Sequence, residues 1–524
     1  MTERRKRKVI FVWKERRIYM RQTIKLNTDN LKIIRKVNER MMSYNIEMAE
    51  VTGGTFWKEY TPEQITGKAK VPAVTIGKEC FTTMREVMQY YSPADLRKKL
   101  LIKLAKRLWS AWVRVYGTWA TGTYYDFDGI TGGVPPAGYQ NVLNKGQWIG
   151  VLEFVKAVGG KLMISVSNCE DDHPDGGELD LSQTEKIFKF SHDYGVDIEA
   201  AEFMNEPNML EISGAPKGYG VEDYSRDQNI FYSWLRKNYP GCLIVGPCSM
   251  ADPSVVGLED RNFGATMRAF CRVCTTEELM KGAEIMPDVF SYHYYNGISE
   301  RAGSVFPELH RTAEDALTDE YLAVASKYAK SYMALRDKYV PDGEMWVTES
   351  GDAAAGGSTW ASTYLDVFRT LNELGSFSLV TNGVIFHNTL ASSDYRFLRH
   401  GTFDPRPDYF AVLLWNELMG QTVYDCGDSD KECVHVYCHS RKDGKKGAVY
   451  LIMNNSLTET LTVEIPKEAE RYTLSAETIR SAEILLNGKP LKISDTSGFP
   501  ELEPVLQGAG RTELPPATCT FLAL

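Results

Sequence analysis

The sequence lacks the long apolar runs and the excess of positive charge that mark two broad classes of protein. No stretch of its 524 residues approaches the roughly 20 consecutive apolar residues of a transmembrane helix. The formal net charge is −9, so no overall positive field attracts nucleic acid or an anionic membrane. One local group of Arg or Lys side chains in a cleft could still bind an anionic substrate. The composition is that of a soluble globular protein.

The ten cysteines do not form the evenly spaced framework of a disulfide-stabilised domain. Cys271 and Cys274 make a lone Cys-x-x-Cys pair, with no second pair at the spacing of zinc ligands. We interpret them, together with Cys433 and Cys438, as free buried thiols and expect no metal. Because neither a disulfide pattern nor a secretory signal is visible, we expect a cytoplasmic protein.

Residues 1–19 are strongly basic. Eight Lys and Arg side chains lie between Arg4 and Arg17, around the short apolar run Val9–Trp13. This run is shorter than the apolar region of a secretory signal, and no small-residue cleavage site follows it. Two interpretations stay open, a functional basic arm or a start placed too early, with Met20 the true beginning. The second would leave secretion open.

Eight short runs rich in β-branched and apolar residues alternate with longer amphipathic stretches. One such stretch is Leu181–Tyr194, where Ser182 and Glu185 have the spacing of a capping box and Gly195 ends the predicted helix. Alternating strands and helices predict a parallel sheet, and eight units favour a closed (β/α)₈ barrel over an open doubly wound sheet. The predicted strands are Ser43–Glu47, Trp112–Tyr116, Lys161–Val166, Ala200–Met204, Leu243–Gly246, Asp288–His293, Glu344–Glu349 and Asn382–His387.

After Gly420 the pattern changes to short strands separated by Asn, Ser, Gly and Pro turns, with no helical periodicity. This pattern predicts an all-β module, most simply a sandwich. We therefore expect a catalytic barrel over residues 43–420 and a β-sandwich over 421–524, joined by strands from residues 20–42. The predicted strands of the module are Val434–Tyr437, Ala448–Met453, Thr460–Ile465 and Tyr472–Ser475.

Two glutamates stand where predicted barrel strands give way to loops. Glu206 lies in the run 202–208 after the fourth strand, and Glu349 lies in the run 345–351 at the end of the seventh. The active residues of such barrels project from the carboxyl ends of the strands. Cleavage of a glycosidic bond needs two facing carboxyl groups, one to protonate the leaving oxygen and one to attack or stabilise the sugar carbon. The pair therefore predicts a glycoside hydrolase.

The motifs around these glutamates resemble a known family. Asn205-Glu206-Pro207 after strand four, with a second Glu ending strand seven, resembles the clan of retaining (β/α)₈ glycosidases. Within the clan, the chain is most similar to the heparanases and β-glucuronidases of glycoside hydrolase family 79. The matching segments are Arg114-Val-Tyr-Gly117-Thr118, His293-Tyr294-Tyr295-Asn-Gly297, Gly356-Gly357, Tyr395, and Phe403-Asp404-Pro405-Arg-Pro407-Asp408-Tyr409.

The resemblance assigns roles to ten residues and implies no cofactor. Glu206 would be the general acid/base and Glu349 the nucleophile. Asn205 would bind the sugar 2-hydroxyl, and Tyr294 would orient Glu349. The other residues that we expect to bind substrate are His293, Thr118, Glu47, which matches an acidic position that contacts sugar hydroxyls, and Tyr395, Gly356 and Gly357, which would hold a uronate carboxylate. The family has another Gly where this chain has Ala355, which weakens the uronate assignment.

Several other residues have two interpretations. Trp119 and Trp360 are either sugar platforms or buried loop anchors. The acidic run 170–173 and the run 126–129 are better explained as hydrogen-bonded loops than as metal sites. Arg396 and Arg399 either supply the local positive field for an anionic glycan or are surface charges.

We therefore expect a retaining β-glucuronidase that acts on uronic-acid-containing oligosaccharides. The two carboxyl groups should lie about 5 Å apart. One alternative is another enzyme of the clan, of the β-xylosidase or α-L-iduronidase type. An alternative from a different class is a glycan-binding protein that has lost catalysis.

Overall fold

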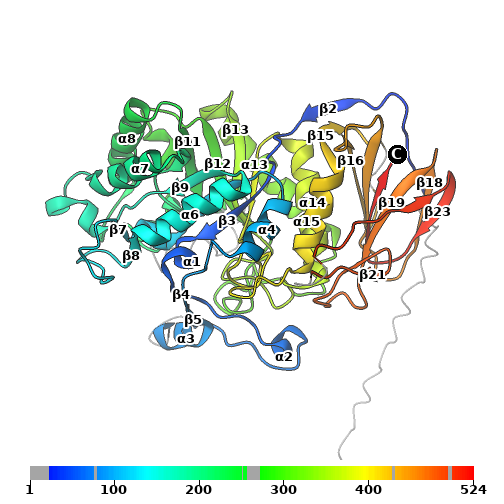
Figure 1. Ribbon diagram of the computed structural model, residues 1–524, viewed down its shortest axis with the longest axis horizontal. Coiled ribbons are helices and arrows are strands. Elements are labelled where there is room, and N and C mark those ends of the chain that lie inside the picture. Colours follow the sequence, from blue (N-terminus) through cyan, green and yellow to red (C-terminus); the bar gives the residue numbers. More distant parts are fainter. Residues whose placement is uncertain (1–22, 76–79, 251, 257–271, 428–430, 494–497) are drawn as a thin grey trace, which may run out of the picture.

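The computed structural model describes residues 23–75, 80–250, 252–256, 272–427, 431–493 and 498–524. Its core is a closed barrel of eight parallel strands (Figure 1). In sequence order these are β3 (Met42–Glu47), β6 (Trp112–Tyr116), β9 (Lys161–Ser165), β10 (Ile198–Glu202), β11 (Leu243–Ser249), β12 (Val289–Tyr295), β13 (Glu344–Gly351) and β14 (Ile385–His387). All eight correspond to predicted strands, and the predicted (β/α)₈ class is confirmed.

Helices follow the strands and surround the barrel, as the handedness of parallel crossovers requires. The longer ones are α4 (Lys99–Arg107), α6 (Lys145–Val158), α7 (Ser182–Tyr194), α8 (Val221–Asn238), α13 (Val324–Tyr339), α14 (Tyr364–Val380) and α15 (Pro407–Leu418). The shorter ones are α1 (Met48–Thr52), α2 (Pro62–Ile65), α3 (Cys80–Val87), α5 (Thr118–Thr121), α9 (Pro253–Val256), α11 (Thr276–Lys281) and α12 (Asp319–Leu322). Two small sheets pair β4 (Gly54–Trp57) with β5 (Met88–Tyr91) and β7 (Thr123–Asp126) with β8 (Asn141–Asn144).

The barrel interior is apolar at one end and charged at the other. Side chains alternate between the two faces of a strand, so inward residues recur at every second position. The amino-terminal half of the interior is filled by the cluster Trp112, Met163, Ala200, Val245, Cys248, Val289, Trp346, Val384 and Phe386. Two positions along β6 from Trp112 comes Arg114, and two along β10 from Ala200 comes Glu202. A sealed apolar floor therefore supports a layer of buried charge at the carboxyl ends of the strands.

The carboxyl-terminal strands form a sandwich beside the barrel (Figure 1). One sheet has the order β2-β15-β16-β17-β24-β19-β20-β21, with β22 also paired to β19, and the other is β1-β18-β23. The strands are β1 (Thr23–Lys25), β2 (Ile33–Lys36), β15 (Met419–Tyr424), β16 (Val434–Arg441), β17 (Ala448–Asn454), β18 (Leu461–Ile465), β19 (Ala469–Ser475), β20 (Leu485–Leu486), β21 (Lys489–Pro490), β22 (Val505–Gln507), β23 (Gly510–Leu514) and β24 (Thr518–Ala523). The domain boundaries that we drew from the sequence stay a prediction.

The sandwich packs on the barrel through α14 and α15, which lie between them (Figure 1). The hydroxyl of Tyr364 on α14 donates to the carbonyl of Leu474 at 2.8 Å, and that of Tyr437 on β16 donates to Asn372 Oδ1 at 2.6 Å. Gly375 of α14 lies so close to the Tyr437 ring that an added Cβ would be 2.2 Å from it. These contacts fix the sandwich against the barrel.

Two local expectations receive different answers. Gly195 ends α7 in the left-handed conformation, as predicted. The predicted capping box is wrong, because the helix already begins at Ser182 with Leu181 as its N-cap, so the Ser182 side chain cannot cap it. Cys274 and Cys438 are buried and Cys433 is half-buried, whereas Cys271 and residues 1–19 lie outside the described residues. Among the described helices, none is both long and apolar enough to cross a membrane.

Candidate active site at the barrel mouth

Glu206 lies just beyond β10, and its backbone is left-handed, with φ at 48°. Its N–H donates to the carbonyl of Cys248 on the next strand, at 3.1 Å. This conformation is unfavourable for a residue with a side chain and persists where the surroundings fix it. The side chain is 14% exposed. The loop therefore turns this carboxyl group into the barrel mouth while keeping it largely out of water.

Glu349 projects from β13, and its two carboxylate oxygens differ in environment. Oε1 accepts from the hydroxyl of Tyr295 and from Nδ2 of Asn388, the latter at 3.2 Å. Oε2 accepts no hydrogen bond within the described part of the chain. It lies 3.7 Å from Nη1 of Arg114, at ion-pair distance. One oxygen is thus held in place, and the other is left as the reactive atom.

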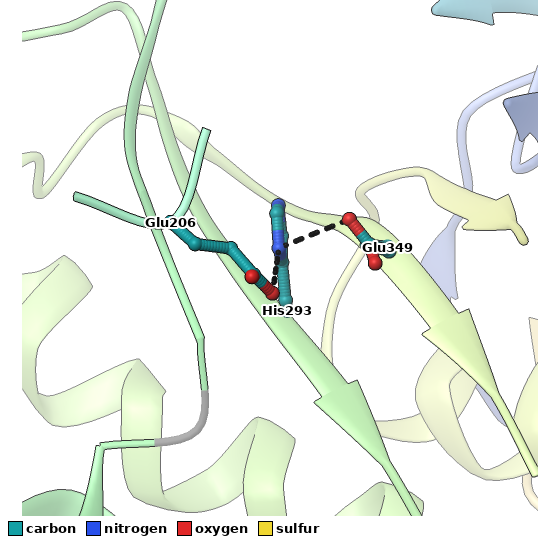
Figure 2. Close-up of side chains that lie close together, drawn as sticks. All are labelled: Glu206, His293 and Glu349. Carbon is teal, nitrogen blue, oxygen red and sulfur yellow. Dashed lines mark hydrogen bonds and ion pairs between the residues drawn. The ribbon is translucent and has the colours of Figure 1, made fainter. Parts of the chain in front are cut away.

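His293 of β12 lies between the two glutamates, with its Nδ1 toward both (Figure 2). Nδ1 is 3.1 Å from Oε1 of Glu206 and 3.3 Å from Oε2 of Glu349. Nε2 is 3.3 Å from Nη2 of Arg114. Because a guanidinium can only donate, Nε2 must accept and Nδ1 must carry the proton of the neutral ring. His293 therefore donates to Oε1 of Glu206, which leaves Oε2 of that glutamate to carry a transferable proton.

Burial sets the protonation of these groups. The pKa of Glu206 is raised to about 7, chiefly by burial, with Arg114 opposing the shift and the nearby Glu202 charge adding to it. Burial likewise raises the pKa of Glu349. Burial lowers the pKa of His293 to about 4, so the imidazole is neutral near pH 7. The site thus keeps Glu206 partly protonated at neutral pH, as a general acid requires.

Arg114 organises the floor of the site from the middle of β6. It donates to both oxygens of Glu202, with Nε at 3.0 Å and Nη2 at 2.6 Å. Nη2 also donates to Oδ1 of Asn205 at 2.8 Å. This bond fixes the amide of Asn205, because its oxygen must face the guanidinium. The NH₂ group of Asn205 is then directed away from Arg114.

The role that we assigned to Tyr294 was misplaced by one residue. Adjacent side chains on a strand point to opposite faces, so His293 and Tyr295 face the barrel interior and Tyr294 faces outward. The Tyr294 ring packs against Tyr328 of α13, with ring centroids 5.5 Å apart. Its neighbour Tyr295 makes the hydrogen bond to Glu349. Tyr294 is a packing residue, and Tyr295 belongs to the site.

The loop predicted to bind a uronate carboxylate lies next to Glu349, with Tyr395 beside it. Tyr395 packs on Tyr295 with ring centroids 6.1 Å apart, and Gly356 and Gly357 both have positive φ. The N–H of Gly357 donates to the carbonyl of Ala353 at 3.1 Å, which corrects the expectation that it is available to substrate. The N–H of Gly356 donates to no acceptor among the residues described. One of the two expected amide donors therefore remains.

Buried Arg301 holds this loop in place. Its Nη1 donates to the carbonyl of Gly357 at 2.9 Å, and its Nη2 forms an ion pair with Asp394 at 2.5 Å. An added Cβ on Gly356 would lie 2.6 Å from Trp57, so only glycine fits there. The loop is thus rigid before any ligand arrives.

Glu47 ends β3 and Thr118 follows β6, and these two strands are neighbours in the barrel. The hydroxyl of Tyr116 donates to Oε1 of Glu47 at 2.7 Å, while Oε2 of Glu47 has no hydrogen-bond partner in the described residues. Burial, and then the charge of Glu349, raise the pKa of Glu47 well above its usual range. Thr118 begins α5 directly after Gly117, which touches Glu47. No direct contact links Thr118 to the glutamate pair among the described residues.

The other residues singled out in the sequence are either buried anchors of loops or parts of hydrogen-bonded turns. Trp360 is buried and packs edge-on against Tyr321, so it is an anchor and not a sugar platform. Trp119 is half-buried and packs edge-on against Phe56. In the acidic run, Asp172 accepts from Tyr139 and the N–H of Cys169, and His173 pairs with Asp227 at 3.0 Å. This run is a hydrogen-bonded loop, as expected.

Three residues of the site were missing from the sequence prediction, namely Arg114, Tyr295 and Asn388. Arg114 left a visible signal, since a single charge interrupts the apolar strand Trp112–Tyr116. Strand alternation places Tyr295 on the same face as His293 and Tyr294 on the other, but it does not say which face is inward. Asn388 follows the three-residue strand β14, where no local pattern marks it.

Glu206, His293 and Glu349 each present one potential ligand atom, and these atoms lie within 4.8 Å of one another. Their chemistry fits proton transfer better than binding of a metal. Arg114 holds Nε2 of His293 as an acceptor, so Nδ1 carries a proton and has no lone pair for a cation. The cationic Arg114 also lies beside Glu349.

Comparison with known proteins places the chain among glycosidases, although no family model matches it. It is 25% identical to heparanase-like protein 1 of Arabidopsis thaliana over 484 residues, which cover 82% of this chain and 84% of the relative. It is 26% identical to baicalin-β-D-glucuronidase of Scutellaria baicalensis, over 45% of this chain and 49% of that protein. Inactive heparanase-2 of Mus musculus is also 26% identical, over 40% of this chain and 39% of that protein.

Among solved structures, a 4-O-α-L-rhamnosyl-β-D-glucuronidase from Fusarium oxysporum has a TM-score of 0.61 at 12% identity. That likeness covers 96% of this chain and 100% of the other. A family 51 arabinofuranosidase from Xanthomonas axonopodis has a TM-score of 0.58 at 15% identity, over 96% of this chain and 99% of that one. These structures share the fold of the chain. The relatives in sequence show that the chain is a glycoside hydrolase similar to the heparanases and β-glucuronidases.

Proposed function

We propose that the chain is a retaining β-glucuronidase that removes β-linked glucuronic acid from oligosaccharides or glycoconjugates. The observation that carries this proposal is the spacing of Glu206 and Glu349, whose nearest oxygens lie within 4.8 Å of one another. Retaining enzymes keep their carboxyl groups about 5 Å apart, whereas inverting enzymes need room for a water between them. The spacing therefore supports double displacement.

In the first step, Oε2 of Glu349 attacks the anomeric carbon, and the bond from that carbon to the leaving oxygen breaks. The proton on Oε2 of Glu206 passes to the leaving oxygen, so the aglycone departs as a neutral alcohol. A covalent glycosyl-enzyme forms on Glu349. Glu206, now ionised, then takes a proton from water. The resulting hydroxide attacks the anomeric carbon and frees Glu349.

His293 and Asn205 orient other groups and stabilise charge, and they do not exchange protons. The Nδ1–H of His293 donates to Oε1 of Glu206 at 3.1 Å, which orients the acid toward the cleft. Asn205, fixed by Arg114, offers its NH₂ to the 2-hydroxyl, where a hydrogen bond strengthens as the sugar approaches the oxocarbenium-like transition state.

The preference for a uronate rests on Tyr395 and Gly356. A phenol and a backbone N–H suit a sugar carboxylate, because they donate hydrogen bonds without filling the space with a side chain. Several relatives and structural neighbours have glucuronidase in their names. The arabinofuranosidase neighbour keeps a neutral-sugar enzyme as the second candidate.

The test is hydrolysis of a panel of p-nitrophenyl glycosides, namely β-glucuronide, β-xyloside, β-glucoside and α-arabinofuranoside. We expect the β-glucuronide to be cleaved fastest and its product to appear first as the β-anomer by NMR. Glu349→Ala should lower kcat by about 10³-fold or more. Glu211→Ala is the matched control, because Glu211 is an exposed glutamate near Glu206 in sequence.

Three outcomes would count against the proposal. Faster cleavage of a neutral glycoside would overturn the uronate assignment but leave the glutamate pair. A first-formed α-anomer would overturn retention. Inactivity of the wild type toward the whole panel would favour the glycan-binding alternative, of which the inactive mouse relative is a precedent.

A further inference from the structure

Three arginines gather around one carboxylate beside the loop that carries Tyr395. Arg396 and Arg399 lie in the segment between β14 and α15, and Arg406 is the N-cap of α15. Their shared carboxylate is Glu59, which follows β4. Nη2 of Arg396 is 2.8 Å from Oε1 of Glu59, and Nε of Arg399 is 3.9 Å from Oε2. Three positive charges therefore face one negative charge.

Arg396 and Arg406 keep unused donors although they are buried. Arg396 is 1% exposed and Arg406 is 8% exposed. The Nε atoms of Arg396 and Arg406 form no hydrogen bond within the described part of the chain, whereas Nη2 of Arg396 and Nε of Arg399 are the atoms paired with Glu59. Buried donors are almost always paired in folded proteins, because an unpaired one loses its hydration without compensation. Two such atoms, on two arginines of one cluster, point to a ligand that accepts hydrogen bonds.

Neighbouring acids do not neutralise the cluster. Asp394 is paired with Arg301 at 2.5 Å. Glu50 accepts from the N–H of Glu47 at 2.8 Å, and burial raises its pKa to about 8, so it is mostly uncharged at pH 7. Burial, together with the charges of Arg396 and Arg399, lowers the pKa of Arg406 to about 10. The excess of positive charge thus remains uncompensated.

The geometry points to an anion site in which Arg396, Arg399 and Arg406 bind an oxyanion, a sulfate or a carboxylate, carried by the saccharide. The planar fork of arginine matches the oxygens of both groups, and its charge is permanent. Arg399, with 43% of its side chain exposed, opens the cluster to solvent. That a saccharide carries the anion rests on the proposed function. The binding of an oxyanion does not.

The cluster shares a wall with the predicted sugar site. Tyr395 precedes Arg396 in sequence, and Tyr60 follows Glu59. The hydroxyl of Tyr60 donates to the carbonyl of Gly357 at 3.0 Å, so one short segment contacts both the glycine loop and the arginines. An anionic group on a sugar next to the one being cleaved would therefore reach the cluster. Recognition would then extend beyond a single glucuronate.

The first experiment titrates wild-type protein and Arg399→Gln with sodium sulfate and follows the thermal midpoint, with sodium chloride at equal ionic strength as the reference for screening. The general stabilising effect of sulfate acts alike on both proteins, so the difference between them reports the site. We expect a larger rise in sulfate for wild type. Arg399→Gln should raise the apparent Kd for sulfate about tenfold or more, the usual effect of losing a charged hydrogen-bond partner. Arg511→Gln, which removes an exposed arginine paired to Glu464 on the sandwich, is the matched control.

A second variant makes the test independent of any folding defect in Arg399→Gln. Glu59→Gln removes the competing carboxylate, so sulfate should bind more tightly than to wild type. Equal midpoints in sulfate and chloride, or sulfate affinities that neither variant changes, would overturn the anion site.

To learn which group on the saccharide supplies the anion, we would measure by calorimetry the binding of a sulfated uronic-acid tetrasaccharide and of its desulfated counterpart. Both are measured in a Glu349→Ala background. If Arg399→Gln weakens only the sulfated ligand, the cluster binds sulfate, and if it weakens both, it binds the carboxylate. If it changes neither, the assignment to the sugar chain is overturned. The sulfate titration needs no glycosidase activity. Its result therefore tests the anion site even if the proposed glucuronidase function is wrong.

Discussion

The phenolic O–H of Tyr295 on β12 donates a hydrogen bond to Oε1 of Glu349 on the neighbouring strand β13. Asn388 donates to the same oxygen at 3.2 Å, so two neutral donors hold the carboxylate from different sides. The second oxygen accepts no hydrogen bond in the described residues and lies near Arg114 and His293. This division is what a nucleophilic carboxylate needs, because a fixed orientation removes the entropy cost of aligning it for attack.

We predict that Tyr295→Phe lowers kcat by about 10²-fold, in the range seen when one preorganised donor is lost. Tyr294→Phe is the matched control, since its ring packs outward on Tyr328 and its hydroxyl does not contact Glu349. It should leave kcat within a few-fold of wild type. Steady-state rates on p-nitrophenyl β-glucuronide distinguish the two. A larger loss in Tyr294→Phe than in Tyr295→Phe would reverse our assignment.

The pKa of Glu206, raised to about 7 by burial, predicts that kcat/KM falls as pH rises through about 7. The acid must be protonated to release the aglycone, and above this pH it is ionised. His293 does not produce this limb, because its pKa is lowered to about 4. The check is a pH profile of wild type and of Glu206→Gln on an activated dinitrophenyl glycoside. An alkaline limb that survives in the variant would assign it to another group.

Most of the barrel could be predicted from the sequence, because parallel strands are buried on both faces and therefore consist of short apolar runs. The glutamate pair could be predicted as well, since a change from apolar to polar residues marks the end of each strand. Local spacing could not show that Trp360 is buried under Tyr321, or that the Gly357 N–H is taken by Ala353. Those facts depend on contacts between segments remote in sequence or on the exact path of a loop.

Tyr294 illustrates a different limit. The run Ser291–Tyr295 contains three consecutive aromatic or imidazole side chains after Tyr292, and nothing in it says which face is inward. The register of β12 against β13, which pairs His293 with Glu349, decides this. A shift of one residue reverses every side chain of a strand. The role was therefore predicted for the right segment and the wrong residue.

We predict that Glu206→Gln stabilises the fold at alkaline pH while abolishing activity on unactivated glycosides. The folded pKa of Glu206 lies above its ordinary 4.5, so its favourable contribution is complete below that value and is lost as pH rises through about 7. The shift corresponds to about 3 kcal/mol at most. Glutamine removes this loss, so the variant should melt higher than wild type at pH 8 and equally at pH 4. Glu211→Gln, at an exposed position, should match wild type at both values.

Finally, Gly117→Ala should disable the site by displacing Glu47. Gly117 has φ at 104°, and an added Cβ would lie 2.0 Å from Oε2 of Glu47, so that carboxyl group must move. Gly67→Ala is a matched control, because Gly67 also has positive φ, at 72°, but has no atom within 4 Å of the added Cβ. Gly67→Ala should cost about 1–2 kcal/mol of stability from backbone strain alone and leave activity unchanged. Gly117→Ala should melt lower than this control and raise KM on p-nitrophenyl β-glucuronide, because the oxygen of Glu47 without a hydrogen-bond partner would no longer face the sugar. Equal melting temperatures and equal KM values would show that Glu47 can move without consequence, and its assignment as a substrate contact would then fail.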